Sequence, residues 1–240
     1  MQYMGGKAMI AKRVVAAIMK DTDARSIWLE PFVGGANVME HAAPHFQEAR
    51  GYDVHPDLIM MWQHVTAGGT LPETITREMY AAHRHATPSS LRGFLGFGAS
   101  FGGKWFGGYG VSPRDGELWR QSARTVARQA GVFRRHGVRF GQADYASLRP
   151  APGSVVYCDP PYLGTTAYAT GGFDHQMFYQ VVQSWAADCF VYVSEYRVLP
   201  GVKHEVIWEC ERRTSLKATV NAEVRLERLF RILPETDPWP

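Results

Sequence analysis

Apolar and polar residues alternate along the N-terminal part of this chain in the manner of successive strands and helices. Short apolar segments at 26–31 and 49–53 predict two buried strands. Each is followed by a helical pattern, at 37–43 and at 56–65, and Pro56 stands in the first turn of the second helix, where its missing amide costs nothing. Strand–helix alternation of this kind favours a parallel α/β sheet.

The strand–helix alternation stops near residue 68 and resumes after residue 135. The segment between contains a helical stretch, a glycine-rich loop at 93–110 and a long arginine-bearing helix from about 117 to 135. After it, the pattern predicts further strands, one more helix and a loose C-terminus, at 138–142, 155–158, 174–187 (the helix), 189–194, 203–210, 226–232 and 234–240. We therefore predict an α/β domain made of residues 1–67 and 136–240, with a mainly helical domain inserted at 68–135.

Charge is distributed unevenly between these two parts. Residues 77–139 contain eleven basic and three acidic residues, a net charge of +8, which leaves −5 for the rest of a chain whose total is +3. A basic block within an acidic remainder indicates a polyanionic partner. For a charge run alone, a solvated helix face would be the favoured explanation. Because this block overlaps a segment rich in glycine and aromatic residues, nucleic acid is the favoured interpretation.

Composition excludes several other classes of protein. Apolar runs such as 189–193 have the length of strands and are far too short to cross a membrane, and the N-terminus has no apolar stretch typical of a signal peptide. No histidine joins a cysteine at zinc-ligand spacing, so no metal is expected. Three cysteines in apolar segments indicate reduced core residues and a cytoplasmic protein: Cys158, Cys189 and Cys210.

The most specific motif is Asp-Pro-Pro-Tyr at 159–162, directly after the predicted strand 155–158. Two prolines fix an extended backbone and remove two amide donors. The Asp159 carboxylate and the Pro160 carbonyl then suit the two N–H groups of an amino-bearing planar base, on which Tyr162 stacks. A bare Asp-Pro pair would be an ordinary turn, but the whole tetrapeptide at a strand end favours a base-binding site.

A second group of residues indicates a nucleoside-containing cofactor. Gly34 and Gly35 follow the first predicted strand and allow close approach of a ligand to the backbone. Asp53 ends the next strand, 19 residues beyond Gly34, which is close to the spacing at which an acid meets a ribose in dinucleotide folds. A helix cap for the helix at Pro56 is the alternative role for Asp53.

Together these motifs resemble those of the Dam-type N6-adenine DNA methyltransferases. The Asp-Pro-Pro-Tyr motif is matched without change, and the glycine/aromatic stretch at 92–110 is similar to the one before that family's DNA-reading helices. Other segments are similar to family motifs and occur in the family's order: 3–7, 30–38, 52–58 and 141–145. Three positions depart from common family residues, although none removes a group with a chemical role: Gln2, Ala36 and His55.

The resemblance implies a Rossmann-like S-adenosylmethionine-dependent methyltransferase that acts on double-stranded DNA and flips an adenine out of the helix for methylation at N6. It makes 1–67 and 136–240 the catalytic domain and 68–135 the target-recognition domain. The implied catalytic residues are Asp159, Pro160 and Tyr162. The implied cofactor-binding residues are Tyr3, Lys7, Phe32, Gly34, Gly35, Asp53, Asp144 and Asp159. The candidates for DNA contact are Arg92 and Lys104, and Arg120, Arg124 and Arg128, which recur every four residues on one helix face.

Three other functions are compatible with parts of the pattern. Methylation of cytosine N4 would use a similar amino group, although Asp159 favours adenine because the N4 members more often carry serine there. A DNA-binding regulator without catalysis is disfavoured by the intact Asp159 and Tyr162. A dehydrogenase-like nucleotide binder leaves the basic insertion unexplained. The family resemblance implies a cytoplasmic protein encoded by a bacterium or a phage, and both a monomer and a homodimer are compatible with the sequence.

Overall fold

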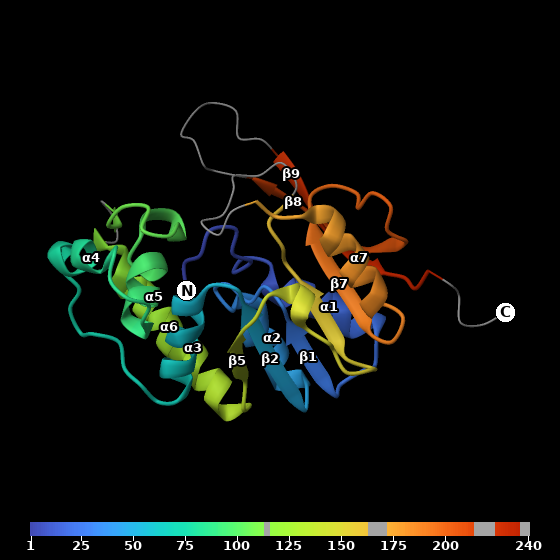
Figure 1. The fold of residues 1–240 in the computed structure, drawn as a ribbon, viewed down its shortest axis with the longest axis horizontal. Coiled ribbons are helices and arrows are strands. Elements are labelled where there is room, and N and C mark those ends of the chain that lie inside the picture. Colours follow the sequence, from blue (N-terminus) through green and yellow to red (C-terminus); the bar gives the residue numbers. More distant parts are fainter. Residues whose placement is uncertain (113–115, 163–171, 214–223, 236–240) are drawn as a thin grey trace.

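One sheet of seven strands organises the computed structural model, which describes residues 1–112, 116–162, 172–213 and 224–235 (Figure 1). The strands lie in the order β5-β2-β1-β6-β7-β9-β8. Their bounds are β1 (Ile27–Glu30), β2 (Glu48–Asp53), β5 (Arg139–Gln142), β6 (Val155–Cys158), β7 (Phe190–Glu195), β8 (His204–Arg213) and β9 (Val224–Ile232). The strands predicted from the sequence are thus confirmed, with small shifts at their ends.

Five neighbouring strands, from β5 to β7, run parallel, whereas β9 runs antiparallel between β7 and β8. From β1 the chain moves outward to β2 and β5, then returns to β6 on the other side of β1. Ligands of open α/β sheets bind at such a reversal, beyond the carboxyl ends of the strands. Glu30, Asp53 and Asp159 stand at the ends of β1, β2 and β6, so the topology brings all three acids to this one edge.

Helices cover both faces of the sheet. One face carries α1 (Ala11–Asp21), α2 (Asn37–Ala42), α3 (Pro56–Thr66) and α6 (Leu118–Arg135), whose apolar residues pack on Trp28 and Tyr157 of the sheet. The other face carries α7 (His175–Trp185), whose Phe178 packs on Val156. The predicted helices after the first two strands, the arginine-bearing helix and the helix before β7 are confirmed, whereas α1 lies outside the predicted elements.

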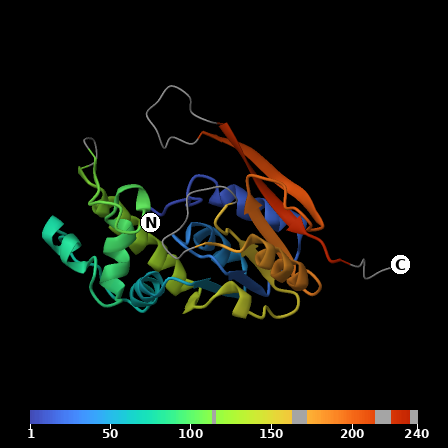
Figure 2. The same ribbon diagram turned by 45° about the horizontal axis from the view of Figure 1, so that its top comes forward.

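The segment that interrupts the alternation forms one end of the molecule (Figures 1 and 2). It contains α4 (Arg77–His83), α5 (Ser90–Gly98) and a two-stranded pair of β3 (Val111–Ser112) and β4 (Gly116–Glu117). The loop predicted at 93–110 is wrong at its start, because α5 extends to residue 98. Ser89 caps this helix by accepting a hydrogen bond from the Arg92 amide. Gly93 allows α5 to touch α3, since a Cβ there would overlap the Asp57 carbonyl.

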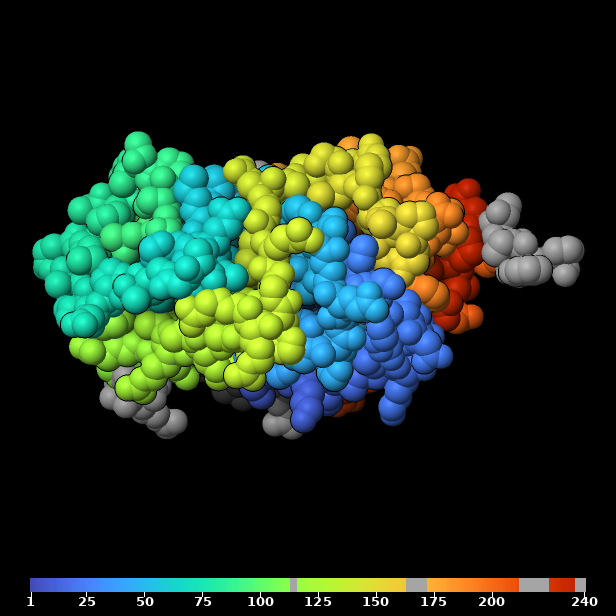
Figure 3. Space-filling view, turned by 90° about the horizontal axis from the view of Figure 1, so that it is seen from below, coloured from blue at the N-terminus to red at the C-terminus, as the bar shows by residue number. Residues whose placement is uncertain are grey.

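The described part of this segment shares its core with the sheet. Phe94 of α5, together with Val126 and Phe133 of α6, belongs to the same buried cluster as Trp62 of α3 and Trp28 of the sheet. In the space-filling view of Figure 3, the segment with α4 and α5 continues into the rest of the molecule without a break. The structure therefore ties this end of the molecule firmly to the face of the sheet. The predicted loose terminus at 234–240 lies mostly outside the described residues.

No helix in the described ranges is both long and apolar enough to cross a membrane.

Candidate active site

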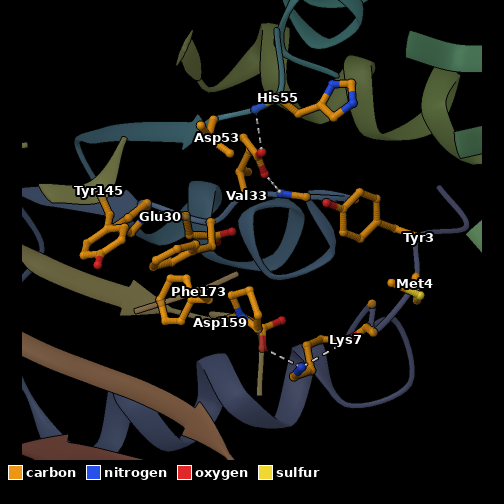
Figure 4. Close-up of a pocket in the computed structure, with 18 of the residues that line it drawn as sticks. Tyr3, Met4, Lys7, Glu30, Val33, Asp53, His55, Tyr145, Asp159 and Phe173 are labelled. Atoms are coloured by element: carbon orange, nitrogen blue, oxygen red, sulfur yellow. Dashed lines mark hydrogen bonds and ion pairs between the residues drawn. The ribbon is translucent and has the colours of Figure 1, made fainter. Parts of the chain in front are cut away.

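A cavity of about 500 Å³ opens at the edge where β1, β2 and β6 end (Figure 4). Its size is in the range of pockets that enclose a cofactor. The structure brings all eight predicted cofactor residues together in its wall: Tyr3, Lys7, Phe32, Gly34, Gly35, Asp53, Asp144 and Asp159. Pro160 and Tyr162 are buried beside it rather than lining it.

Aromatic rings form one side of this cavity. The Phe32 ring lies 5.3 Å from that of Tyr145 and 5.8 Å from that of Phe173, measured between centroids. The Asp144 carboxylate is exposed next to them and accepts a hydrogen bond from the Ala146 amide at 2.9 Å. Flat apolar surfaces beside a carboxylate suit a purine with an exocyclic amino group.

Asp53 is fixed in the middle of the cavity wall by two backbone amides. Its Oδ2 accepts a hydrogen bond from Gly34 at 3.1 Å, and its Oδ1 accepts one from His55 at 3.0 Å. Burial raises the pKa of Asp53 to about 6, although both amides oppose the rise. Asp53 does not cap α3, because the N-cap residue is His55 and no side chain caps that helix. A carboxylate held in this way is oriented to accept hydrogen bonds from a ligand.

The N-terminal segment closes the opposite side of the cavity (Figure 4). Gly34 has a positive φ of 45°, and a Cβ there would come within 2.8 Å of the Tyr3 ring. The Tyr3 ring also lies 4.9 Å from Phe97, and the Met4 amide donates to the Gly103 carbonyl at 3.1 Å. The N-terminal segment and the inserted segment therefore pack directly against each other.

Lys7 reaches across this wall to the Asp-Pro-Pro-Tyr motif. Its Nζ lies 2.6 Å from Oδ1 of Asp159 and 4.5 Å from the centre of the Tyr162 ring. Burial acts to lower the pKa of Lys7, but the carboxylates of Asp159 and Glu227 outweigh burial and raise that pKa. Burial raises the pKa of Asp159, and the Lys7 ammonium opposes that rise. At 2.6 Å, Lys7 and Asp159 therefore form a close ion pair at the Asp-Pro-Pro-Tyr motif.

Glu227 is a site residue that the sequence reasoning missed. It comes from β9, is 0% exposed, and accepts a hydrogen bond from the Tyr162 hydroxyl. Its Oε1 also lies 3.8 Å from Nζ of Lys7. The sequence gives one weak indication of its burial. Residues two apart on a strand point to the same face, so Glu227 shares its face with the apolar Leu229.

Glu30 adds another buried acid to the cavity. The Trp28 indole donates a hydrogen bond to its Oε1 at 2.8 Å. Burial raises the pKa of Glu30 to about 8, with the Trp28 bond acting against the rise. Glu30 is therefore largely protonated at neutral pH, unlike an ordinary surface glutamate.

The candidates for DNA contact differ in their surroundings. Arg92 is 16% exposed, pairs with Asp57 at 2.7 Å and also donates to the carbonyls of His83 and Arg84. Lys104 is exposed and lines the rim of the cofactor-sized cavity.

On α6, the three predicted arginines are exposed, but two of them are paired. Arg120 lies 3.2 Å from Glu117, and Arg128 pairs with Glu40 of α2. Among the described residues Arg124 has no ion-pair partner, so it is the arginine of this face best able to meet a phosphate.

Comparison with known families gives one match, over the N-terminal part of the chain. The family model of the D12 class N6 adenine-specific DNA methyltransferases matches residues 3–94, a range that contains Tyr3, Lys7, Gly34 and Asp53. No curated protein matches the chain.

Several solved structures are similar to this chain at low sequence identity. An RNA methyltransferase from Salinibacter ruber, solved with S-adenosyl-L-homocysteine, is 14% identical, with 95% of each chain covered and a TM-score of 0.41. A protein from Thermoplasma acidophilum is 11% identical over 95% of this chain and 89% of its own, with a TM-score of 0.47. The 23S rRNA methyltransferase ErmE is 12% identical over 99% of this chain and 72% of its own, with a TM-score of 0.44.

Proposed function

We propose that this chain, whose residues 3–94 match the family model of the D12 class N6 adenine-specific DNA methyltransferases, belongs to that class and transfers a methyl group from S-adenosylmethionine to N6 of an adenine in double-stranded DNA. The family implies an S-adenosylmethionine-dependent DNA methyltransferase. The observation that supports the finer assignment is Asp159, which lies at the end of β6 between a cofactor-sized cavity and the buried Tyr162 ring.

The cavity fits the proposed cofactor in the chemistry of its wall. S-Adenosylmethionine supplies, when bound, a methyl group on an electrophilic sulfonium centre. Phe32 and Tyr145 provide flat surfaces for its adenine, and Asp144 provides an acceptor for the amino group of that adenine. The two oxygens of Asp53 suit the ribose hydroxyls, and the glycine turn beside Tyr3 leaves room for the amino-acid end.

Asp159 and Tyr162 carry the proposed catalytic step. A target adenine cannot be reached inside the duplex, so it has to be flipped into the site. Its amino nitrogen is a weak nucleophile, because the lone pair is delocalised into the ring. Hydrogen bonds from the amino group to Asp159 and to the Pro160 carbonyl would localise this lone pair and aim it at the methyl group. The rate then comes from positioning and electrostatics, without a covalent enzyme intermediate.

Residues 68–135 are proposed to bind the DNA. Arg124 and Arg120 are exposed on α6, and Lys104 stands at the rim of the cavity, where a nucleotide entering the site would pass. Such side chains supply the sequence-independent part of DNA affinity through phosphates. The contacts of Arg92 favour a different role, because its guanidinium holds α5 to α3 through Asp57.

The proposed function is tested with labelled cofactor and unmethylated DNA of mixed sequence. After reaction the DNA is digested to nucleosides, and the methylated nucleoside is identified by mass spectrometry. N6-methyl-2′-deoxyadenosine is expected, and methylation-sensitive sequencing of the same DNA then gives the target site. N4-methyl-2′-deoxycytidine as the product, or cofactor binding without any transfer to DNA, would contradict the proposal.

A further inference from the structure

Lys7 places its ammonium within a buried group of three other side chains of the candidate active site. The ammonium is 2.6 Å from Asp159, 3.8 Å from Glu227 and 4.5 Å from the centre of the Tyr162 ring. Lys7 is 4% exposed, and Glu227 is completely buried. Two carboxylates therefore share this ammonium in a place shielded from water.

In this arrangement the ammonium stands where the target base has to go. The proposed reaction requires an oxygen of Asp159 to accept a hydrogen bond from the adenine amino group and requires the Tyr162 ring to stack on the base. Lys7 engages Asp159 through Oδ1 and lies over the face of the Tyr162 ring. The ammonium therefore competes with the base for Asp159 and for the Tyr162 ring, and a shift of Lys7 would free both for the base.

A buried ammonium that leaves one carboxylate needs another, because an unpaired charge in the protein interior is strongly unfavourable. Glu227 meets this need without large motion. Its carboxylate is about 1 Å beyond the length of a charge-assisted hydrogen bond to Lys7. The lysine side chain has a flexible four-carbon stem, whereas Glu227 is fixed in β9, which is paired with strands on both sides.

We propose that Glu227 is a positioning residue that keeps Lys7 while the target adenine occupies Asp159 and Tyr162. The inference rests on the proposed function, since it concerns the way in which that site receives its base. Lys7 neutralises Asp159 in the resting protein and moves toward Glu227 in the loaded one. The hydrogen bond from the Tyr162 hydroxyl to the same carboxylate keeps the ring in place during this exchange.

A purely structural role is the competing explanation, in which Glu227 does no more than accept the Tyr162 hydrogen bond. Two substitutions separate the roles. Glu227→Gln keeps a carbonyl oxygen that can accept from Tyr162 but removes the negative charge. Tyr162→Phe keeps the charge and the ring but removes the hydroxyl. If Glu227 holds Lys7, the charge matters more than the hydroxyl.

The test measures methyl transfer to a duplex that carries the target site found by sequencing. In Glu227→Gln, kcat is expected to fall about ten-fold or more, while the cofactor Kd from calorimetry stays within about two-fold. The decrease in kcat should be much smaller in Tyr162→Phe. In a Lys7→Met background the Glu227→Gln exchange should add little, because coupled residues are not additive. Glu209→Gln on the neighbouring strand β8, 55% exposed, is the matched control and should leave kcat unchanged.

Wild-type formation of N6-methyladenine reports on the proposed function, and the ratio of variant to wild-type kcat reports on Glu227. A wild-type kcat in Glu227→Gln, or the same loss with and without Lys7, would overturn the inference. If Glu227→Gln does not fold by circular dichroism, Glu227→Asp provides the test. It keeps the charge within reach of the long lysine, so it should be about as active as Tyr162→Phe. A folded, cofactor-binding but inactive Glu227→Asp would also overturn the inference.

Discussion

Lys7 and Asp159, 152 positions apart in the chain, form an ion pair of 2.6 Å at the carboxyl edge of the sheet. Lys7 comes from the turn before α1, where its carbonyl accepts hydrogen bonds from the Ile10 and Ala11 amides. Asp159 follows β6 directly. The pair links the N-terminal segment, which closes the cavity, to the motif proposed to hold the reacting amino group. The ion pair thus joins the cavity proposed for the cofactor to the site proposed for the target base.

Replacing Asp159 with alanine is expected to abolish turnover, with a loss in kcat of about 100-fold or more, because the reacting amino group loses its charged acceptor. The fold should persist, since Lys7 can still pair with Glu227. Transfer of labelled methyl groups to DNA measures the effect, and circular dichroism checks the fold. The control is Asp188→Ala, which removes an exposed carboxylate in the turn between α7 and β7. Near-normal methylation by Asp159→Ala would exclude the proposed mechanism.

Replacing Tyr162 distinguishes stacking from hydrogen bonding. Tyr162→Ala removes the ring, and stacking of a base on an aromatic side chain contributes about 1–3 kcal/mol. Tyr162→Phe keeps the ring and loses only the hydrogen bond to Glu227. Methylation should therefore fall strongly in the alanine variant and only modestly in the phenylalanine variant. Equal damage in both would show that stacking is the wrong explanation.

The predicted cofactor residues of the cavity wall could be found from the sequence, because the strands and turns that carry them follow from local pattern and topology. Gly34 and Asp53 follow neighbouring parallel strands, and parallel strands end at the same edge, so these residues had to come close together. The hydrogen bond from the Gly34 amide to Asp53 joins them directly. Asp144 and Asp159 reach the same cavity for the same reason.

What the sequence could not predict depends on tertiary contacts. Glu227 becomes a partner of Tyr162 only because β9 returns between β7 and β8, and strand order at that end has no local signature. Phe173 enters the cavity from the segment before α7 without any motif. The helical start of 93–110 escapes prediction because glycine usually disfavours helices, whereas Gly93 here permits contact between α5 and α3.

Cofactor affinity is predicted to depend on pH through Asp53. Burial raises the pKa of this carboxyl to about 6, and only the ionised form offers both oxygens as acceptors to the ribose. Affinity should be full above about pH 7 and fall as the pH drops through 6, by up to about ten-fold per pH unit. Calorimetry between about pH 5 and 8 measures this dependence.

Asp53→Asn provides the matched control for this dependence, since it has nearly the same shape and cannot titrate. Its affinity should be lower at about pH 7.5 and should change less between about pH 7 and pH 5 than that of the wild type. Glu30, His55 and Asp159 also face the cavity and remain in the variant, so the difference between the two profiles isolates Asp53. Parallel profiles in the two proteins would remove Asp53 from the ribose site.

Glu30 is predicted to make the free energy of unfolding depend on pH. Burial raises its folded-state pKa to about 8, well above the ordinary value of 4.5. The unfolded chain therefore releases this proton first. The contribution of Glu30 to the free energy of unfolding is therefore constant below about pH 4.5. Between there and about pH 8 it decreases by about 1.4 kcal/mol per pH unit. Glu30→Gln should remove this loss. The free energy of unfolding from urea titration should therefore rise in the variant relative to the wild type between about pH 5.5 and pH 8. A constant difference, as expected for Glu209→Gln, would contradict the burial effect.

The exposed arginines of α6 are predicted to bind DNA phosphates. Neutralising Arg120, Arg124 and Arg128 to glutamine should weaken DNA binding and flatten its salt dependence, by about 0.9 in the log–log slope for each phosphate that the protein no longer neutralises. Arg124→Gln alone should account for much of the effect, because Arg120 and Arg128 are paired with Glu117 and Glu40. Fluorescence anisotropy of a labelled duplex at several salt concentrations measures both quantities.

The control for this prediction neutralises a basic face of the same size elsewhere. Lys12, Arg13 and Lys20 are exposed on α1, outside the proposed recognition segment, and their triple glutamine variant should bind DNA almost as the wild type does. Because Glu40 is buried and loses a partner when Arg128 is replaced, the thermal unfolding of each variant has to be compared. Cofactor affinity should stay unchanged in both triple variants. If the α6 variant instead keeps the wild-type affinity, salt slope and target site, the three arginines are only solvent-exposed residues of α6. The DNA then binds to another surface of the protein.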